Sequence, residues 1–176
     1  QILHGTFYND SKRGVVLCPP HPLYGGRRND TRLVRIAREL ASNNISALCI
    51  DYGSYGNGVK EVEDVLNAFF YMGKRTDSIG LLGYSFGAVV ASNAATKLPI
   101  KGFAALSILK KVDSLEANLD FDCPKLFVHG KYDDIAPYSD LEDLYLKAKG
   151  RKEKLILETD HFYMENYPKL MDSILK

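Results

Sequence analysis

Residues 79–87, which read Ile-Gly-Leu-Leu-Gly-Tyr-Ser-Phe-Gly, constrain the fold of this chain more than any other part of its sequence. They place Ser85 between two glycines at the end of an apolar run, and a helix-like stretch, 88–97, follows at once. A strand that turns this sharply into a helix leaves no room for a Cβ two residues before or after the serine, so Gly83 and Gly87 are needed. The pattern predicts a strand–turn–helix that lifts the Ser85 hydroxyl clear of the backbone.

The Gly-x-Ser-x-Gly spacing alone is weak evidence. A match arises by chance in roughly 5% of chains of this length. A serine directly before a helix is also a common N-cap residue. The alternative interpretation is therefore a glycine-rich turn in which Ser85 only caps the helix that follows, and the rest of the chain has to separate the two.

The size and charge of the chain limit the classes of protein to which it can belong. Its 176 residues suit a single domain, 1–176, with a sizeable core. The formal net charge of +1 argues against a nucleic-acid-binding face. No apolar run approaches the roughly 20 residues that cross a bilayer, and the polar start, 1–10, is unlike a signal peptide. We expect neither nucleic-acid nor membrane partners, and the sequence leaves the oligomeric state open.

The three cysteines, Cys18, Cys49 and Cys123, cannot all pair with one another. Cys18 and Cys49 lie in apolar runs, where a free thiol behaves as a small hydrophobic side chain. We expect reduced, buried and structural thiols, which predicts a cytoplasmic protein. The sequence has no metal-ligand spacing and no glycine loop that would cradle a phosphate, so neither a metal nor a cofactor is expected.

Short apolar runs alternate with helical patterns along the chain. The predicted strands are 14–18, 45–51, 78–82, 102–108, 125–129 and 154–158. The predicted helices are 31–42, 59–72, 86–97, 138–149 and 163–175. This alternation predicts an α/β fold, a three-layer sandwich in which a mostly parallel twisted sheet has helices on both faces.

A serine hydroxyl becomes a good nucleophile only when a base takes its proton and an acid orients that base. Behind a strand-to-helix turn of this kind the chain order is serine, acid, histidine. Of the four histidines, His4 and His21 precede Ser85. The acids that directly follow a strand come after His129, so His129 does not fit the order either. Only His161 satisfies it.

The loop 130–137 supplies the acid, because it directly follows a predicted strand. It contains Asp133, which we favour, and Asp134, which we interpret as a turn or cap residue near the next helix. Asp160 is a poor candidate, since side chains adjacent in sequence diverge and it directly precedes the candidate histidine. His129, at the end of the strand, is interpreted as a structural histidine that holds the turn by hydrogen bonds.

The oxyanion that forms when a serine attacks a carbonyl group needs two hydrogen-bond donors, usually backbone N–H groups. One is expected from Phe86, directly after the serine. The other is expected from the loop 19–26, whose prolines have no N–H to donate. His21, Leu23 and Tyr24 remain, and we favour His21 for its position.

The chain resembles the α/β-hydrolase superfamily, and within it the small lidless serine hydrolases near the dienelactone-hydrolase-like group. The matching stretches follow the family's order from about Val15 onward: 21–26, 83–88, 127–130 with Asp133 and Pro137, and 160–162. The resemblance implies Ser85 as nucleophile, Asp133 as acid and His161 as base, on a fold without a lid domain. Dienelactone hydrolases themselves use cysteine, so the serine argues against that activity. The short N-terminus predicts that the first antiparallel strand is absent or supplied by further residues.

A lidless site favours small or extended acyl substrates. Leu23, Tyr24, Tyr84 and Phe162 neighbour the candidate catalytic positions and are expected to contact substrate, with core packing as the alternative for each aromatic. The predicted function is a serine hydrolase that cleaves a carboxylic ester or thioester of a small acyl substrate through an acyl-enzyme. Two alternatives remain open: a peptidase or amidase with the same three residues, and a catalytically silent scaffold that binds a ligand.

A basic stripe follows one side of the predicted helix 31–42. Arg28, Arg32 and Arg35 form it, opposite the apolar face of the helix. We interpret the stripe as a solvated face. The alternative is that Arg27 or Arg28, just beyond the loop 19–26, captures an acidic substrate.

Overall fold

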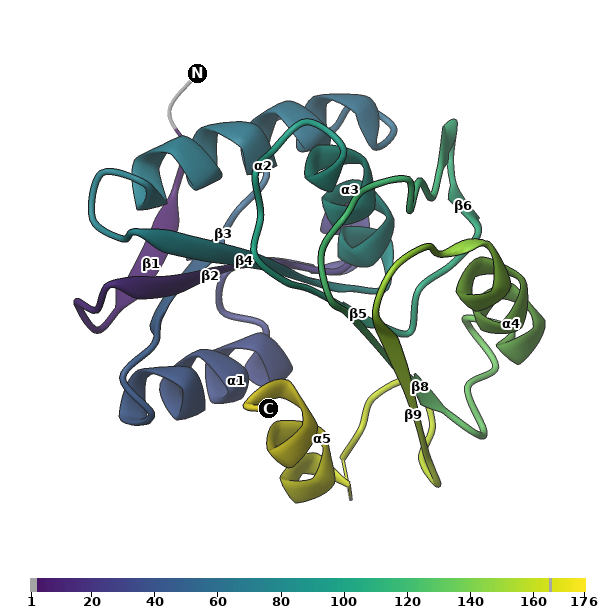
Figure 1. Cartoon of the computed structure of the whole chain (residues 1–176). Coiled ribbons are helices and arrows are strands. Elements are labelled where there is room, and N and C mark those ends of the chain that lie inside the picture. Colours follow the sequence, from purple (N-terminus) through teal and green to yellow (C-terminus); the bar gives the residue numbers. More distant parts are fainter. Residues whose placement is uncertain (1–2, 165) are drawn as a thin grey trace.

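The structure is a computed structural model that describes residues 3–164 and 166–176. Its main sheet has seven strands in the order β1-β3-β2-β4-β5-β8-β9 (Figure 1). These are β1 (Gly5–Tyr8), β2 (Arg13–Cys18), β3 (Ser46–Ile50), β4 (Ser78–Tyr84), β5 (Phe103–Leu106), β8 (Lys125–Gly130) and β9 (Lys152–Leu157). Neighbouring strands are parallel except β1 and β3, which are antiparallel. The mostly parallel sheet that the alternating pattern predicted is therefore confirmed. Two short strands, β6 (Lys111–Val112) and β7 (Leu115–Glu116), form a separate hairpin.

Helices cover both faces of the sheet, which confirms the predicted three-layer sandwich. They are α1 (Thr31–Ser42), α2 (Val59–Met72), α3 (Phe86–Ala95), α4 (Tyr138–Lys147) and α5 (Tyr167–Ile174). Figure 1 shows α1 and α5 on one face and α2, α3 and α4 on the other. Within the described ranges, no helix combines the length and the hydropathy needed to cross a bilayer.

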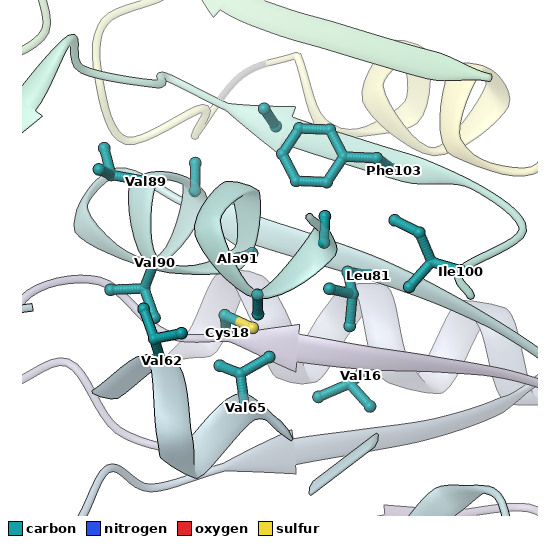
Figure 2. Close-up of a cluster of buried hydrophobic side chains, with 14 of the residues drawn as sticks. Val16, Cys18, Val62, Val65, Leu81, Val89, Val90, Ala91, Ile100 and Phe103 are labelled. Atoms are coloured by element: carbon teal, nitrogen blue, oxygen red, sulfur yellow. The ribbon is translucent and has the colours of Figure 1, made fainter. Parts of the chain in front are cut away.

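Two apolar layers hold the sandwich together, one on each face of the sheet. Because side chains alternate along a strand, Leu81 of β4 packs into the layer under α2 and α3, and Leu82 packs into the layer under α1 and α5. Figure 2 shows side chains of α2 and α3 meeting those of β2 and β4 in the first layer. All three cysteines are buried free thiols, and Cys18 belongs to this layer.

Helix α1 illustrates how the local sequence sets these elements. Asp30 accepts hydrogen bonds from the N–H groups of Arg32 and Leu33, so it caps the helix N-terminus. The buried residues of the helix recur every three or four positions and face the sheet: Leu33, Ile36, Ala37 and Leu40. The observed helix has the predicted bounds.

The first strand differs from the prediction. β1 pairs antiparallel with β3, from Gly5 opposite Ile50 to Tyr8 opposite Ala47, so the chain itself supplies the first antiparallel strand. The run Thr-Phe-Tyr within β1 consists of residue types that favour strands and is the sequence signal for it.

The last helix begins later than predicted. The prediction 163–175 starts at Tyr163, whereas α5 spans Tyr167–Ile174, and Glu165 lies outside the described residues. Tyr163 has a φ of 57°, in the left-handed region that a right-handed helix excludes. Pro168 lies in the first turn of α5, where its missing N–H costs nothing. The other predicted elements differ from the observed ones by two residues or fewer at either end.

The carboxyl ends of the parallel strands meet at one edge of the sheet. Cys18 lies opposite Gly83, and Leu106 lies between Tyr84 and Val128. The loops after β2, β4, β5, β8 and β9 therefore start from the same edge, where ligands bind in open α/β sheets.

Candidate active site

Ser85 lies in a strained turn between β4 and α3. Its backbone has φ 56° and ψ −119°, which a non-glycine residue adopts only where the surrounding structure enforces it. A Cβ on Gly83 would lie 2.4 Å from the Cα of Ala88, and a Cβ on Gly87 would lie 2.2 Å from the carbonyl oxygen of Cys18. The Ser85 side chain makes no capping hydrogen bond to α3. The turn therefore has the geometry of a nucleophile elbow, and the interpretation of Ser85 as a mere helix cap is wrong.

We expect Gly87→Ala to destabilise the chain, because its new methyl group would collide with the backbone of β2. The free energy of unfolding should fall by about 2 kcal/mol or more. Gly102→Ala is the matched control, since a Cβ there meets nothing within 4 Å, and it should change stability by less than about 0.5 kcal/mol. Urea unfolding of both variants measures the difference, and equal stabilities would contradict the packing described for the elbow.

Asp133, in the loop after β8, is the carboxylate that contacts His161. Its Oδ2 and Oδ1 lie 2.8 and 3.0 Å from His161 Nδ1. Because an ionised carboxylate only accepts, Nδ1 carries the proton and donates it, and Nε2 of the neutral ring is free to take a proton. Asp134 is exposed, and Asp160 accepts the Phe162 N–H. The structure therefore brings Asp133, and neither of the other two candidates, to the histidine.

Ser107 contacts the Asp133 carboxylate and Tyr163 in turn contacts Ser107, and the sequence did not predict either role. Ser107 Oγ donates to Asp133 Oδ2 at 2.6 Å and lies 2.6 Å from Tyr163 Oη, which also donates to the Val128 carbonyl. Both residues have positive φ angles, 48° and 57°. The prediction placed Ser107 inside a strand and Tyr163 at the start of a helix. Neither motif nor spacing carries a signal for a buried partner of this kind.

The surroundings of Asp133 keep it ionised. Burial by itself would raise its pKa, but hydrogen bonds from His161, Ser107 and the Ala136 N–H outweigh that effect and hold the pKa of Asp133 below its ordinary value. The Ile135 N–H also donates to Oδ1, at 3.0 Å. Asp133 can thus orient the imidazole and stabilise its protonated form without itself taking the proton.

Tyr84 joins the elbow to the His161 loop from inside the core. Its hydroxyl donates to the His161 carbonyl oxygen at 2.7 Å, and the two rings lie 5.2 Å apart. The ring is 1% exposed and packs under α1 and α5, and burial raises the pKa of Tyr84, so the phenol stays a neutral donor. The prediction that Tyr84 contacts substrate is therefore wrong, because its side chain is enclosed on the inner face of the sheet.

The Ser85 hydroxyl and His161 Nε2 lie at the same edge of the sheet, each without a hydrogen-bond partner in the part of the chain that the structure describes. Neither atom is among the buried polar atoms that lack a partner, so both reach solvent although their residues are only 7% and 5% exposed. Residues 106 and 107 link the two groups. The Leu106 carbonyl accepts the Ser85 N–H, and Ser107 donates to Asp133, which contacts His161. A hydrogen bond between a serine and a histidine of a catalytic site is often long until substrate binds.

Two of the predicted oxyanion donors, the backbone N–H groups of Phe86 and His21, have no acceptor among the residues that the structure describes. In the loop after β2, the Leu23 N–H donates to His21 Nδ1 and the Tyr24 N–H donates to the His21 carbonyl. Of the three candidates in that loop, only the His21 N–H has no acceptor within residues 3–164 and 166–176, and the same holds for Phe86. The His21 and Phe86 ring centroids lie 4.6 Å apart, so the two residues that carry the predicted donors are neighbours.

Exposed apolar side chains surround this edge. Leu23 and Tyr24 are 65% and 87% exposed on one side, and Phe162 is 44% exposed beside His161, with the two rings 5.8 Å apart. These three predicted substrate residues are therefore available to a ligand. In the described part of the chain, no three His, Cys, Asp or Glu side chains are grouped so that they would hold a metal ion.

The predicted basic stripe is not a freely solvated face. Arg28 Nη1 lies 2.8 Å from Asp51 Oδ2, and Arg32 pairs with the cap residue Asp30. The Arg35 guanidinium lies 3.7 Å over the ring of a tyrosine in α5. The Arg28 side chain is 40% exposed, so its pairing with Asp51 leaves part of the guanidinium open to solvent.

His129 has the structural role that the sequence suggested. It is fully buried, and its Nε2 donates to the Ala136 carbonyl at 2.9 Å, which closes the loop that carries Asp133. Burial lowers the pKa of His129 below its ordinary value. The ring is therefore neutral in the folded chain at pH values where the unfolded chain takes up a proton.

This depressed pKa makes stability depend on pH. The contribution is fully present above the unfolded value of 6.5 and is lost as the pH falls below it, by up to about 1.4 kcal/mol per pH unit. In His129→Gln, which keeps a donor for Ala136, this dependence is absent. Urea unfolding at about pH 7, 6 and 5 measures the free energies of unfolding of the wild type and of His129→Gln, which should approach each other as the pH falls. A difference that stays constant with pH would contradict the burial of a neutral imidazole.

Comparison of the sequence with known proteins assigns no family to the chain. No protein-family model matches the chain. An uncharacterized protein of Rickettsia prowazekii is 27% identical over 164 residues, which covers 82% of this chain and 69% of that protein.

Solved structures are similar over nearly the whole chain. An alpha-beta serine hydrolase homologue from Coxiella burnetii is 21% identical with a TM-score of 0.87, covering 97% of this chain and 88% of that one. A serine hydrolase without lid from Xanthomonas campestris is 20% identical, with a TM-score of 0.81 and coverages of 98% and 86%. A dienelactone hydrolase from Anabaena variabilis is 16% identical, with a TM-score of 0.79 and coverages of 98% and 91%. The chain therefore has the α/β-hydrolase fold in its small form without a lid.

Proposed function

We propose that this chain is a serine hydrolase that cleaves a carboxylic ester or thioester of a small acyl substrate through an acyl-enzyme. Ser85 is the nucleophile, His161 the general base and Asp133 the orienting acid. The observation that carries the proposal is the bond between Asp133 and His161 Nδ1. It leaves Nε2 free at the edge where the strained elbow presents an unbonded serine hydroxyl.

These groups can perform each step of acyl transfer. Ser85 Oγ attacks the carbonyl carbon and gives its proton to His161 Nε2, while the N–H groups of Phe86 and His21 stabilise the oxyanion. When the tetrahedral intermediate collapses, the bond to the alcohol or thiol breaks and His161 returns its proton to that leaving group. Water then attacks the acyl-enzyme with His161 again as base, which releases the acid and restores Ser85.

The surroundings of Ser85 support a small acyl group. The connection between β5 and β8 contains only the short hairpin β6–β7, so no lid domain encloses a long chain. Leu23 and Tyr24 on one side and Phe162 on the other offer apolar contact at the surface. The names of the Coxiella burnetii and Xanthomonas campestris structures, which describe serine hydrolases, support the same reaction class.

A panel of p-nitrophenyl esters from acetate to palmitate, with a matched thioester and anilide of the preferred acyl group, tests the proposal. We expect turnover of the ester and thioester that is highest for short acyl groups, with the anilide slower. Faster anilide cleavage would favour the peptidase or amidase. Ligand binding that persists in Ser85→Ala, with no turnover by the wild type, would favour a silent scaffold.

A further inference from the structure

The tip of the β6–β7 hairpin contacts the loop after β2. The Asp113 carboxylate at this tip accepts a hydrogen bond from the Tyr55 hydroxyl, and its Oδ2 lies 3.4 Å from His21 Nε2. Tyr55 Oη lies 3.5 Å from the same nitrogen. The three side chains therefore connect the hairpin, the loop after β3 and the loop that carries the candidate oxyanion donor.

These contacts select one tautomer of His21. Its Nδ1 accepts the Leu23 N–H at 3.2 Å, so that nitrogen carries no proton. The neutral ring must then be protonated at Nε2, which faces Tyr55 and Asp113. The hydrogen bond to Asp113 raises the pKa of Tyr55 to about 12, so the phenol keeps its proton and donates it to the carboxylate. The resulting order of donors is His21 to Tyr55 to Asp113.

The hairpin holds Asp113 in place because three of its other residues, Val112, Leu115 and Glu116, contact the rest of the fold. Asn93 of α3 donates to the Glu116 carbonyl at 2.8 Å, and Leu115 packs so closely on Gly58 that a Cβ there would lie 2.9 Å from the Leu115 side chain. Val112 is buried in the apolar layer with α3. Asp113 itself has a φ of 50°, as expected of a residue fixed in a tight turn.

We propose that Asp113 is a positioning residue for the reaction: through Tyr55 it fixes the Nε2–H tautomer of His21 and so aims the His21 N–H at the oxyanion. The tautomer matters because Nδ1 must accept the Leu23 N–H to close the turn Pro22–Tyr24 directly after His21. With that turn closed, the His21 peptide stays beside Phe86. This inference rests on the proposed function and adds a residue to its oxyanion site.

The kinetic test compares Asp113→Ala with Lys111→Ala, an exposed residue of the same hairpin. Asp113→Ala should weaken the contact of the His21 N–H with the oxyanion, which exists only in the transition state. It should therefore lower kcat by a factor on the order of 10² and leave KM unchanged. Lys111→Ala should stay within twofold of the wild type. A rise in KM alone, an unchanged kcat, or an equal loss in Lys111→Ala would overturn the proposal.

The spectroscopic test does not depend on turnover. Long-range ¹H–¹⁵N spectra of the imidazole rings, with His21→Gln to assign the signal, should show the Nε2–H tautomer of His21 in the wild type and in Ser85→Ala. In Asp113→Ala the signal should move toward a mixture of tautomers. An unchanged tautomer in that variant would overturn the proposal even if activity fell.

Tyr55→Phe serves as a second variant in case Asp113→Ala does not fold. It removes only the hydroxyl between His21 and Asp113, and it should reproduce the loss of kcat and the tautomer change to a smaller extent. An inert wild type whose His21 tautomer still depends on Asp113 would contradict the proposed function and leave the contact itself established. If Tyr55→Phe kept the wild-type kcat and the wild-type tautomer of His21, the proposed role of Tyr55 between Asp113 and His21 would be contradicted.

Discussion

Ser85→Ala is expected to lower kcat by about 10⁶-fold, the loss seen when the nucleophile of a Ser–His–Asp hydrolase is removed. The fold should be unaffected, because Ser85 Oγ makes no hydrogen bond in the described part of the chain and alanine would carry the same backbone strain. Steady-state hydrolysis of the preferred ester measures the loss, and thermal unfolding checks the fold.

Ser139→Ala is the matched control, since Ser139 is an exposed serine away from the elbow. Its activity and unfolding temperature should match those of the wild type. If Ser85→Ala retained more than about a hundredth of the wild-type kcat, a far smaller loss than removal of a nucleophile causes, Ser85 would not be the nucleophile.

Asp133→Asn should lower kcat by about 10⁴-fold with little change in KM, as the same change does in other Ser–His–Asp hydrolases. The amide can donate to His161 Nδ1, which places the ring proton on Nε2 and removes the base that Ser85 needs. The lowered pKa of Asp133 means that the wild type keeps its carboxylate charged throughout the neutral range. The kcat of both proteins on the same ester measures the effect.

Asp134→Asn is the control for that variant, because Asp134 is the adjacent, exposed acid. It should have wild-type kcat. A comparable loss in both variants, or a loss only in Asp134→Asn, would contradict the assignment of Asp133.

The sequence predicted those parts of the molecule that depend on local pattern. The spacing of Leu33, Ile36 and Leu40 predicted α1, and chain order was enough to select His161. The place of the acid after a strand limited it to Asp133 and Asp134, of which Asp133 was favoured, and the contact with His161 distinguishes the two. These features depend on hydrophobic periodicity, backbone sterics and chain topology. The spacing and order of residues along the sequence are enough to predict them.

The parts that the sequence did not predict depend on contacts between distant segments. Ser107 and Tyr163 are 56 residues apart and meet only because β5 and the loop after β9 end at the same edge. Tyr84 was predicted as a substrate contact because it adjoins Ser85, but strand alternation turns its ring into the core. The contact of Asp113 with His21 in the loop after β2 likewise joins segments far apart in the sequence.

Labelling with a fluorophosphonate, followed by peptide mass spectrometry, tests the central claim most directly. The folded wild type should form one covalent adduct, on the peptide that contains Ser85. Ser85→Ala should form none, and Asp133→Asn should react far more slowly. A folded wild type that stays unlabelled, or an adduct on any other residue, would contradict the assignment of Ser85, His161 and Asp133 as the catalytic groups.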